Sequence, residues 1–419
     1  MKRFTTCAFV IAMLFTACDN NKGNGEMPWD EDLNNKPEIT TTAEIGKALP
    51  LWSEGCLDIH FINTGRGECC FYILPDGTTL LVDAGEIETD SETVAQRPNS
   101  TVRPVVTYAS YIKHFLPDGK KYIDYCAPSH LHIDHIGSSK VSTETAPAGY
   151  RKAGLTSLFD LVPFKHVLDR AYPDYPTDDS HATIPMIDGQ FSKDWGVFVK
   201  WGVKEGKFTA DIFTPGQKQI TLLNNADKYN NFSILNICAN GFAWSKSGLV
   251  GKKSTEGNPA SCGFHISYGP FDYIACGDLT SSAQNLMAQY FVDFIGDRKL
   301  EAFKCNHHLA SNAWGSQMQS TGFNPRVVLN HCFSVNKPDP EKWKYVLDLG
   351  LNFFATNIHK DIQAKPEVIS NKLLEKTSAY DGHIVLRVSD NGESFYVYTL
   401  DDTNFDYIVK TIHGPYQSK

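Results

Sequence analysis

The chain has 419 residues, of which 42 % are hydrophobic and 12 % aromatic, so it can bury a large core and disorder is not expected. Its formal net charge of −9 and the lack of a long run of Lys or Arg argue against a protein that coats nucleic acid. Stable nucleic-acid binding is therefore not expected, and no feature of the sequence points to a protein partner.

The first eighteen residues have the pattern of an export signal. Lys2 and Arg3 give a positive start, and residues 8–15 form an apolar stretch too short to span a bilayer. Residues 14–18, Leu-Phe-Thr-Ala-Cys, resemble a bacterial lipobox, in which Cys18 is lipidated and becomes the new N-terminus. An ordinary cleaved signal with an incidental cysteine is the alternative. The lipobox predicts a protein of the cell envelope, outside the cytoplasm, that contacts a bacterial membrane only through its lipid.

The segment after the signal differs in composition from the rest of the chain. Residues 19–50 are rich in Asn, Asp, Glu, Lys, Thr and Pro and predict a flexible tether. Residues 51–419 alternate between strand-like and helix-like segments and predict one folded domain. In its first half we expect a helix at 105–115 and strands at 57–62, 69–74, 78–82, 122–126, 164–168, 195–203 and 210–213.

The second half repeats this alternation. We expect helices at 281–291 and 341–349, and strands at 232–238, 263–268, 273–276, 302–306 and 327–329. Two late strands, 384–388 and 395–398, flank the turn Asp390-Asn-Gly392 and predict a hairpin. Two strand-rich halves that each end in helices predict an α/β (α+β) fold, with sheet packed on sheet and helices outside in an αββα order.

Nine cysteines remain when Cys7 and Cys18 are set aside. No CxxC pair occurs, so a structural zinc ribbon is not expected. Most of these cysteines lie in apolar segments, which predicts buried thiols that act as small hydrophobic groups. Export would also permit a disulfide, whose pairing stays open.

The hexapeptide His130-Leu-His-Ile-Asp-His135 is the most informative segment of the chain. It follows a predicted strand and places three imidazoles and one carboxylate within six residues. Imidazole nitrogen and carboxylate oxygen are ligands that suit zinc. A chance cluster of polar residues in a loop is the alternative interpretation.

This hexapeptide resembles the signature of the metallo-β-lactamase superfamily. Further motifs follow the same order along residues 57–360 and resemble the branch that includes the ComEC-type hydrolase domain and the phosphorylcholine esterases. These motifs are Asn63-Thr-Gly-Arg-Gly-Glu68, Leu81-Val-Asp-Ala-Gly85, Asn230-Asn-Phe-Ser233, Cys276-Gly-Asp278 and His307-His308.

The resemblance implies a hydrolase with two adjacent metal ions, zinc or alternatively manganese, that share a hydroxide nucleophile. The implied ligands are His130, His132, Asp134, His135, Asp278, His307 and His308. Asp278 would bridge the two ions and Asp134 would orient the nucleophile, so these two are the catalytic candidates. Which ion each histidine of the pair serves stays open. Asp83 is expected to support the ligands from behind.

The sequence departs from the family pattern in three places. A further histidine often precedes the bridging aspartate; His166 and His181 are the candidates, but a strand edge and a polar loop are the simpler interpretations. Leu309 replaces a usual glycine, although Ser311 is kept. Residues 336–340 (Asn-Lys-Pro-Asp-Pro) stand where Gly-His-Pro is typical.

The expected substrate is a phosphodiester or phosphate ester, either a small molecule or a component of the envelope. Asn231, Ser311 and Lys246, the last in the Gly-rich loop 241–261, are the residues expected to contact it. Hydrolysis of a carboxylic ester, a lactone or a β-lactam is one alternative. An inactive surface-binding lipoprotein of the same fold is another.

Overall fold

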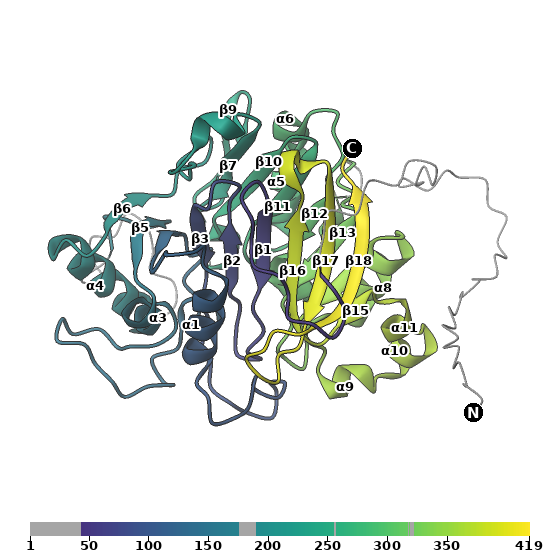
Figure 1. Ribbon diagram of the computed structural model, residues 1–419, viewed down its shortest axis with the longest axis horizontal. Coiled ribbons are helices and arrows are strands. Elements are labelled where there is room, and N and C mark those ends of the chain that lie inside the picture. The colour runs from purple at the N-terminus through teal and green to yellow at the C-terminus, as the bar shows by residue number, and fades with distance from the viewer. Residues whose placement is uncertain (1–42, 176–189, 255–256, 317, 319–321) are drawn as a thin grey trace, which may run out of the picture. The chain divides into compact units, whose positions relative to one another are not determined.

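Two β-sheets pack face to face in the middle of the protein (Figure 1). The computed structural model describes residues 43–175, 190–254, 257–316, 318 and 322–419. The export signal, Cys18, most of the tether and His181 lie outside these described residues. Within them, each sheet contains nine strands.

Sheet one has the strand order β18-β17-β16-β1-β2-β3-β4-β5-β6. Its strands are β1 (Leu57–Phe61), β2 (Cys70–Ile73), β3 (Thr79–Val82), β4 (Ile123–Cys126), β5 (Phe164–Asp169), β6 (Thr209–Ile212), β16 (His383–Val388), β17 (Ser394–Leu400) and β18 (Val409–Gln417). The expected late hairpin is confirmed as β16 and β17, which pair antiparallel.

Sheet two has the strand order β15-β14-β13-β12-β11-β10-β7-β8-β9. Its strands are β7 (Phe232–Ala239), β8 (Phe242–Ser245), β9 (Gly248–Gly251), β10 (Gly263–Tyr268), β11 (Phe271–Ala275), β12 (Ala302–Lys304), β13 (Val327–Asn330), β14 (Asn352–Ala355) and β15 (Ala379–Tyr380). The Gly-rich segment that we expected as a loop therefore contains the antiparallel pair β8 and β9.

Helices cover the outer face of each sheet (Figure 1). Sheet one is covered by α1 (Pro104–Phe115), α3 (Leu155–Leu161) and α4 (Gln190–Lys204). The helices on the side of sheet two are α5 (Ser281–Gln289), α6 (Val292–Ile295), α8 (Pro340–Asp348), α9 (Lys360–Gln363), α10 (Pro366–Ser370) and α11 (Leu373–Lys376). The four-layer αββα order expected from the sequence is confirmed.

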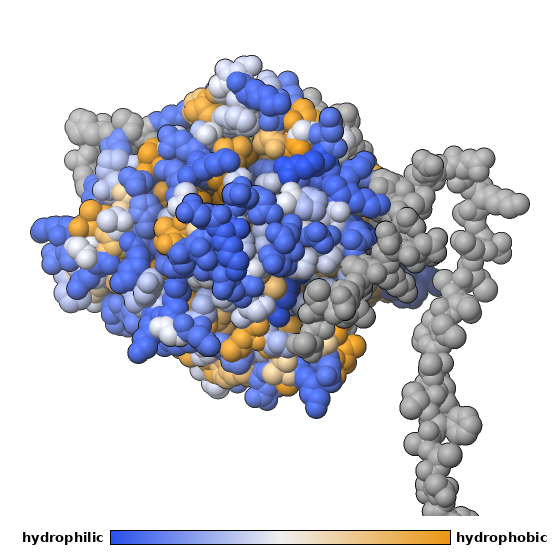
Figure 2. Space-filling model, turned by 45° about the horizontal axis from the view of Figure 1, so that its top comes forward, coloured by the Kyte–Doolittle hydropathy of each residue, from blue (hydrophilic) through white to orange (hydrophobic). Residues whose placement is uncertain are grey.

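The central strands, such as β1, β2 and β11, have apolar side chains on both faces because both faces are buried, whereas the outer strands β6 and β9 are mostly exposed. On β1, Leu57 and Ile59 point into the core between the sheets, whereas His60 points outward and lies 3.0 Å from the hydroxyl of Tyr111 on α1. Helix α1 begins at Pro104, whose missing N–H costs nothing in the first turn. The surface in Figure 2 is mostly hydrophilic, with hydrophobic residues scattered over it.

The prediction of a strand at residues 195–203 was wrong, because this segment belongs to α4. Trp195, Phe198 and Val199 are buried in the core of sheet one, at helical spacings of three and four, while Val197 is exposed. The alternating Trp and Val residues imitate the period of a strand. Tertiary packing of the helical face decides the structure here.

The nine described cysteines are free thiols, and all are buried except Cys56, which is half-buried. This agrees with the expectation of small hydrophobic groups. No helix within the described residues is both long enough and apolar enough to cross a membrane.

Candidate metal centre

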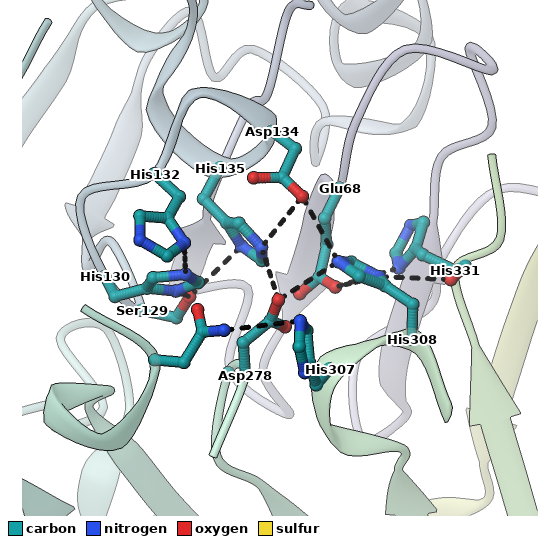
Figure 3. A network of polar contacts seen from close by, with 12 residues as sticks. Glu68, Ser129, His130, His132, Asp134, His135, Asp278, His307, His308 and His331 are labelled. Carbon is teal, nitrogen blue, oxygen red and sulfur yellow. Dashed lines mark hydrogen bonds and ion pairs between the residues drawn. The ribbon is translucent and has the colours of Figure 1, made fainter. Parts of the chain in front are cut away.

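The candidate ligands follow the C-terminal ends of strands, and these ends lie on the same side of both sheets. Strands β3 and β4 run parallel in sheet one, and β11, β12 and β13 run parallel in sheet two. The hexapeptide comes after β4 and includes the short helix α2 (Ile133–Ile136), Asp278 comes after β11, and His307 and His308 come after β12. Proteins with such sheets place ligand sites beyond the C-terminal ends of parallel strands. Figure 3 shows these residues side by side.

A deep cluster forms around Asp278. Its Oδ2 lies 3.3 Å from His135 Nε2 and 3.2 Å from His308 Nε2. The Oδ2 of Asp134 lies 3.5 Å from His308 Nε2 and 3.9 Å from His135 Nε2. Two imidazole nitrogens, one from each sheet, thus face two carboxylates, which is a donor set that suits zinc.

The other ring nitrogen of each of these histidines has a partner of its own. His135 Nδ1 lies 2.8 Å from Asp83 Oδ2, and His308 Nδ1 lies 3.1 Å from the carbonyl oxygen of His331. Both partners are acceptors, so in a neutral ring each Nδ1 carries the proton and each Nε2 presents its lone pair to the carboxylates. Such an arrangement is repulsive unless a cation lies between them, and metal-binding histidines are commonly oriented in this way.

The burial of these atoms supports the same assignment. The Nε2 atoms of His135 and His308 and the Oδ1 atom of Asp278 are buried and make no well-aligned hydrogen bond to any described residue. Buried polar atoms without a partner are costly unless a ligand satisfies them. The donor set therefore fits a divalent metal ion.

The electrostatics of the cluster also favour a cation. Burial disfavours each charge, yet the neighbouring histidines hold the pKa of Asp278 and of Asp134 well below the usual range. In turn these carboxylates outweigh burial and raise the pKa of His135 and of His308. The carboxylates stay ionised, and positive charge between them is stabilised.

His130 and His132 form a second pair of donors. His130 Nε2 lies 3.0 Å from His132 Nδ1. Ser129 Oγ donates to Asp83 Oδ2 at 2.7 Å and lies 3.1 Å from His130 Nδ1, from which it accepts. Because His130 Nδ1 carries the proton, the lone pair of His130 Nε2 lies beside His132 Nδ1. Two such nitrogens could bind one ion together. Asp83 thus stands behind both groups of donors.

The structure separates the roles of His307 and His308. His308 belongs to the deep cluster (Figure 3), whereas His307 lies between two asparagines. Its Nδ1 donates to Asn312 Oδ1 at 2.6 Å, and its Nε2 accepts from Asn258 Nδ2 at 3.2 Å. Burial lowers the pKa of His307 to about 4, so the ring is neutral at pH 7.

The turn that carries this pair has a left-handed backbone. The φ angles of His307, His308 and Leu309 are 46°, 51° and 58°, and such a conformation costs about 1–2 kcal/mol for each non-glycine residue. Leu309, which replaces a glycine of the family pattern, has a fully buried side chain. Its carbonyl oxygen accepts the N–H of Asp339 at 2.8 Å. Packing and this hydrogen bond hold the strained turn in place.

Lys337 lies on the segment that this hydrogen bond ties to the turn. Burial and the neighbouring histidines and carboxylates are the main causes of the pKa shifts of Asp134, His307 and His308. The ammonium of Lys337 makes a smaller contribution to each shift. A cation therefore stands at the rim of the cluster. Sequence analysis noted this segment only as a departure from the family pattern.

Sequence analysis assigned no role to three residues that lie next to the cluster, although one of them, Glu68, ends a motif that it quoted. The Oε2 of Glu68 lies 3.6 Å from His308 Nδ1 and 3.8 Å from His331 Nδ1, and Lys304 Nζ lies 3.0 Å from Glu68 Oε1. Glu68 also shares a space of metal-site dimensions with His135, Asp278 and His308. The signal was available, because Glu68 and Lys304 are charged residues at the margins of apolar strands.

Two residues expected to contact substrate lie elsewhere, and these expectations are corrected. Asn231 precedes β7, and its carbonyl oxygen accepts the N–H of Gly269. It therefore lies at the opposite ends of the strands from the metal centre. Lys246 lies in the turn between β8 and β9, where its N–H donates to Asp293 Oδ2 at 2.9 Å. Strand direction explains both, because β11, which leads to Asp278, runs parallel to β7 and antiparallel to β8. Ser311 lies between the histidine pair and Asn312.

Of the two extra histidine candidates, His166 does not join the cluster. His166 lies on β5, where its Nδ1 is 2.7 Å from Thr209 Oγ1 on β6 and its Nε2 is 3.5 Å from Asp211. His181 lies outside the described residues.

Fold and cluster together define an αββα protein with a candidate metal centre at its strand ends. No protein-family model matches the sequence, and no curated protein matches it. Among solved structures, the chain is similar to Igni18, a metallo hydrolase from Ignicoccus hospitalis, at 11 % identity and a TM-score of 0.33, with 79 % of this chain and 98 % of that chain covered.

Two further solved structures are similar in the same range. Zinc-bound PqqB from Methylobacterium extorquens shows 11 % identity and a TM-score of 0.36, over 77 % of this chain and 87 % of that chain. AbOPH, a hydrolase of the β-lactamase superfamily, shows 8 % identity and a TM-score of 0.27, over 76 % and 92 %. At these values the alignments by themselves assign no function to this chain.

Proposed function

We propose that the protein is a metal-dependent hydrolase of the metallo-β-lactamase type, near the ComEC-type and phosphorylcholine esterase branch, that cleaves a phosphodiester or phosphate ester. The observation that carries the proposal is the convergence of His135 Nε2 and His308 Nε2 on Asp278 and Asp134. Their other nitrogens are held by acceptors, so both lone pairs are directed at one space.

The donors divide into two groups that Asp278 can join. His135, His308 and Asp134 would hold one ion, and His130 and His132 would hold the other. Oδ2 of Asp278 faces the first group, and its Oδ1 is left without a hydrogen bond among the described residues. Zinc, or alternatively manganese, would supply Lewis acidity at the reacting centre when bound.

The remaining residues have roles that follow from their contacts. Asp134 is half-buried, so its carboxylate can accept a hydrogen bond from the water that attacks phosphorus. Hydrolysis forms a bond from the water oxygen to phosphorus and breaks the ester P–O bond, and the departing oxygen takes up a proton. Neutral His307 has both ring nitrogens engaged by Asn258 and Asn312, so its ring is held in place on this face of the site.

An anionic substrate is supported by the charge at the rim. The Lys337 ammonium acts electrostatically on Asp134, His307 and His308, so its positive charge would also favour a phosphoryl group bound beside them. Lys246, which sequence analysis offered for this role, lies in the turn beside Asp293.

We also propose the location given by the sequence, with a lipid at Cys18 holding the enzyme to a bacterial membrane outside the cytoplasm. The support is the lipobox and the polar tether that follows it.

Turnover of paired substrates tests the substrate class. We expect kcat/KM for a bis-aryl phosphate, with added zinc or manganese, to exceed that for a chromogenic cephalosporin. A tenfold preference for the cephalosporin, equivalent to about 1.4 kcal/mol in the barrier, would refute the phosphoesterase assignment. Faster turnover of an aryl ester or lactone would do the same. Metal content near zero in the active protein would refute the metal-dependent hydrolase itself.

A further inference from the structure

A buried ion pair lies beneath the metal centre and has no role in the chemistry proposed above. Glu68 precedes β2 in sheet one, and Lys304 ends β12 in sheet two. Lys304 Nζ lies 3.0 Å from Glu68 Oε1, and both side chains are at most 1 % exposed. The pair therefore joins the two sheets directly below Asp278 and His308.

The ammonium of Lys304 has three acceptors around it. Besides its ion pair with Glu68, it donates to the carbonyl oxygen of Gly277 at 3.1 Å and to that of Cys305 at 3.3 Å. Gly277 immediately precedes Asp278, and Cys305 begins the turn that carries His307 and His308. One side chain thus fixes the backbone of both segments that bring sheet-two ligands to the centre.

Glu68 faces the ligands with its other oxygen. Its Oε2 lies 3.6 Å from His308 Nδ1 and 3.8 Å from His331 Nδ1 (Figure 3). The main chain of Glu68 is tied to the hexapeptide as well, because its N–H donates to the carbonyl oxygen of Asp134 at 2.8 Å. Glu68 and Lys304 together therefore contact segments that carry ligands from both sheets.

The stability of the fold alone does not explain why a charged pair is buried here. Two charges removed from water lose their hydration, and a well-packed apolar pair of similar volume often serves the fold as well or better. An apolar pair cannot make directional contacts. It would offer no N–H groups to the carbonyl oxygens of Gly277 and Cys305 and no carboxylate beside His308. Preorganised ligands bind a metal more tightly because less ordering accompanies binding.

We propose that Glu68 and Lys304 are positioning residues that hold Asp278, His308 and the hexapeptide in place for the metal. This proposal rests on the metal centre of the proposed function but not on its substrate. Its measurable consequence is metal affinity and ligand geometry, which can be read without turnover.

The double variant Glu68→Gln/Lys304→Met provides the test. Either single variant leaves one buried charge without a partner and is expected to unfold readily, whereas the double variant removes both charges at nearly constant volume. We expect it to fold, to bind Zn²⁺ at least about tenfold more weakly than the wild type, and to show an altered visible spectrum when Co²⁺ is bound.

A second buried ion pair supplies the matched control. Arg387 on β16 donates to Asp58 on β1 at 2.8 Å and 2.6 Å, away from the strand ends that carry the ligands. The variant Asp58→Asn/Arg387→Met should change Tm and leave the Zn²⁺ affinity and the Co²⁺ spectrum as in the wild type.

The outcomes separate this proposal from the proposed function. If the Glu68→Gln/Lys304→Met variant keeps the wild-type affinity and spectrum, or if the control loses affinity equally, the positioning role is overturned and the metal centre stands. If the wild-type protein binds no divalent ion, both proposals are overturned.

Discussion

At the scale of single residues, the metal centre depends on what stands behind each ligand. Asp83 accepts from His135 and Ser129, and the carbonyl oxygen of His331 accepts from His308, so the ring orientations are fixed before any ion binds. The carboxylate of Asp278 then receives two Nε2 atoms at similar distances. A change at Asp278 should therefore affect the metal far more than the fold.

The variant Asp278→Asn should lose metal and activity together. The amide keeps the shape of the side chain but removes the negative charge that faces His135 and His308. We expect kcat/KM to fall by at least about 100-fold and at least one ion to be lost per chain, as measured by elemental analysis and steady-state kinetics. His166→Ala is the control, since His166 contacts Thr209 and Asp211. Loss of metal from that control would show that His166 has been misplaced.

Lys337 offers a prediction about charge. Lys337→Gln removes the cation at the rim, and we expect KM for an anionic phosphate ester to rise about tenfold at low salt. The effect should shrink at high salt, because screening weakens the attraction in the wild type too. Lys344→Gln is the matched variant, since Lys344 is paired with Asp348 on α8. Equal KM values for both variants at low salt would remove Lys337 from substrate binding.

At the scale of elements, strand direction decides where each predicted site residue lies. The hexapeptide and Asp278 were recognised by local motifs, and both lie at C-terminal strand ends. Asn231 was also assigned from a motif, but it lies at the N-terminal end of β7. A sequence motif alone does not show at which end of a strand its residues lie. Helix α4 was misassigned because alternating Trp and Val have a strand period. The contact of Glu68 with Lys304 joins residues 236 positions apart, which no local pattern reveals.

In the strained turn after β12 we expect a glycine variant to be more stable than an alanine variant, which is the reverse of their usual order in a helix. Leu309→Ala removes buried volume but keeps the left-handed φ of 58° on a residue with a Cβ. Leu309→Gly removes slightly more volume and relieves the strain. Both variants should lose about 2–4 kcal/mol of unfolding free energy, with the glycine variant more stable by about 0.5–1 kcal/mol.

Chemical denaturation measures this difference, and α1 supplies the comparison. Ala109→Gly in the middle of α1 should follow the ordinary order and lose at least about 1 kcal/mol, because a buried methyl group is lost as well. If the glycine variant at position 309 is the less stable of its pair by a similar amount, the turn carries no backbone strain.

The junction of β16 with the turn after β1 predicts a pH dependence. His383 Nδ1 accepts the N–H of Asn63 at 2.9 Å, and burial lowers the pKa of His383 from 6.5 to about 3. Below pH 6.5 the unfolded chain binds a proton that the native state excludes, so stability present above this pH is lost as the pH falls towards 3.

His383→Gln keeps an acceptor for Asn63 without this titration. Between pH 7 and pH 4 the wild type should lose about 3 kcal/mol more unfolding free energy than the variant. Urea denaturation at the two pH values measures the difference. Parallel losses in both proteins would mean that His383 does not resist protonation in the native state.

At the scale of the whole molecule, we propose that only the polar tether links the folded body to the membrane. The folded part described here contains no helix that could span a bilayer, and its surface in Figure 2 shows hydrophobic residues dispersed among hydrophilic ones. Residues 46–49 are already bonded to the folded body beside β18, which leaves residues 19–42 as tether; at about 3.3 Å per residue when extended they could hold the body up to about 80 Å from the lipid. The proposed hydrolase would then act on headgroups or soluble substrates near the membrane.

The variant Cys18→Ala tests this arrangement. The thiol of Cys18 is the acyl acceptor that the lipobox predicts, and several acyl chains together exceed the marginal membrane affinity of a single chain. We expect labelled fatty acid to be incorporated into the wild-type protein and not into the variant, and the variant to leave the detergent phase on partitioning. Cys7→Ala is the matched control, since Cys7 lies within the export signal and should have no effect on labelling. Labelling of the Cys18→Ala variant at the wild-type level would refute the lipobox, and the metal centre would be unaffected by that result.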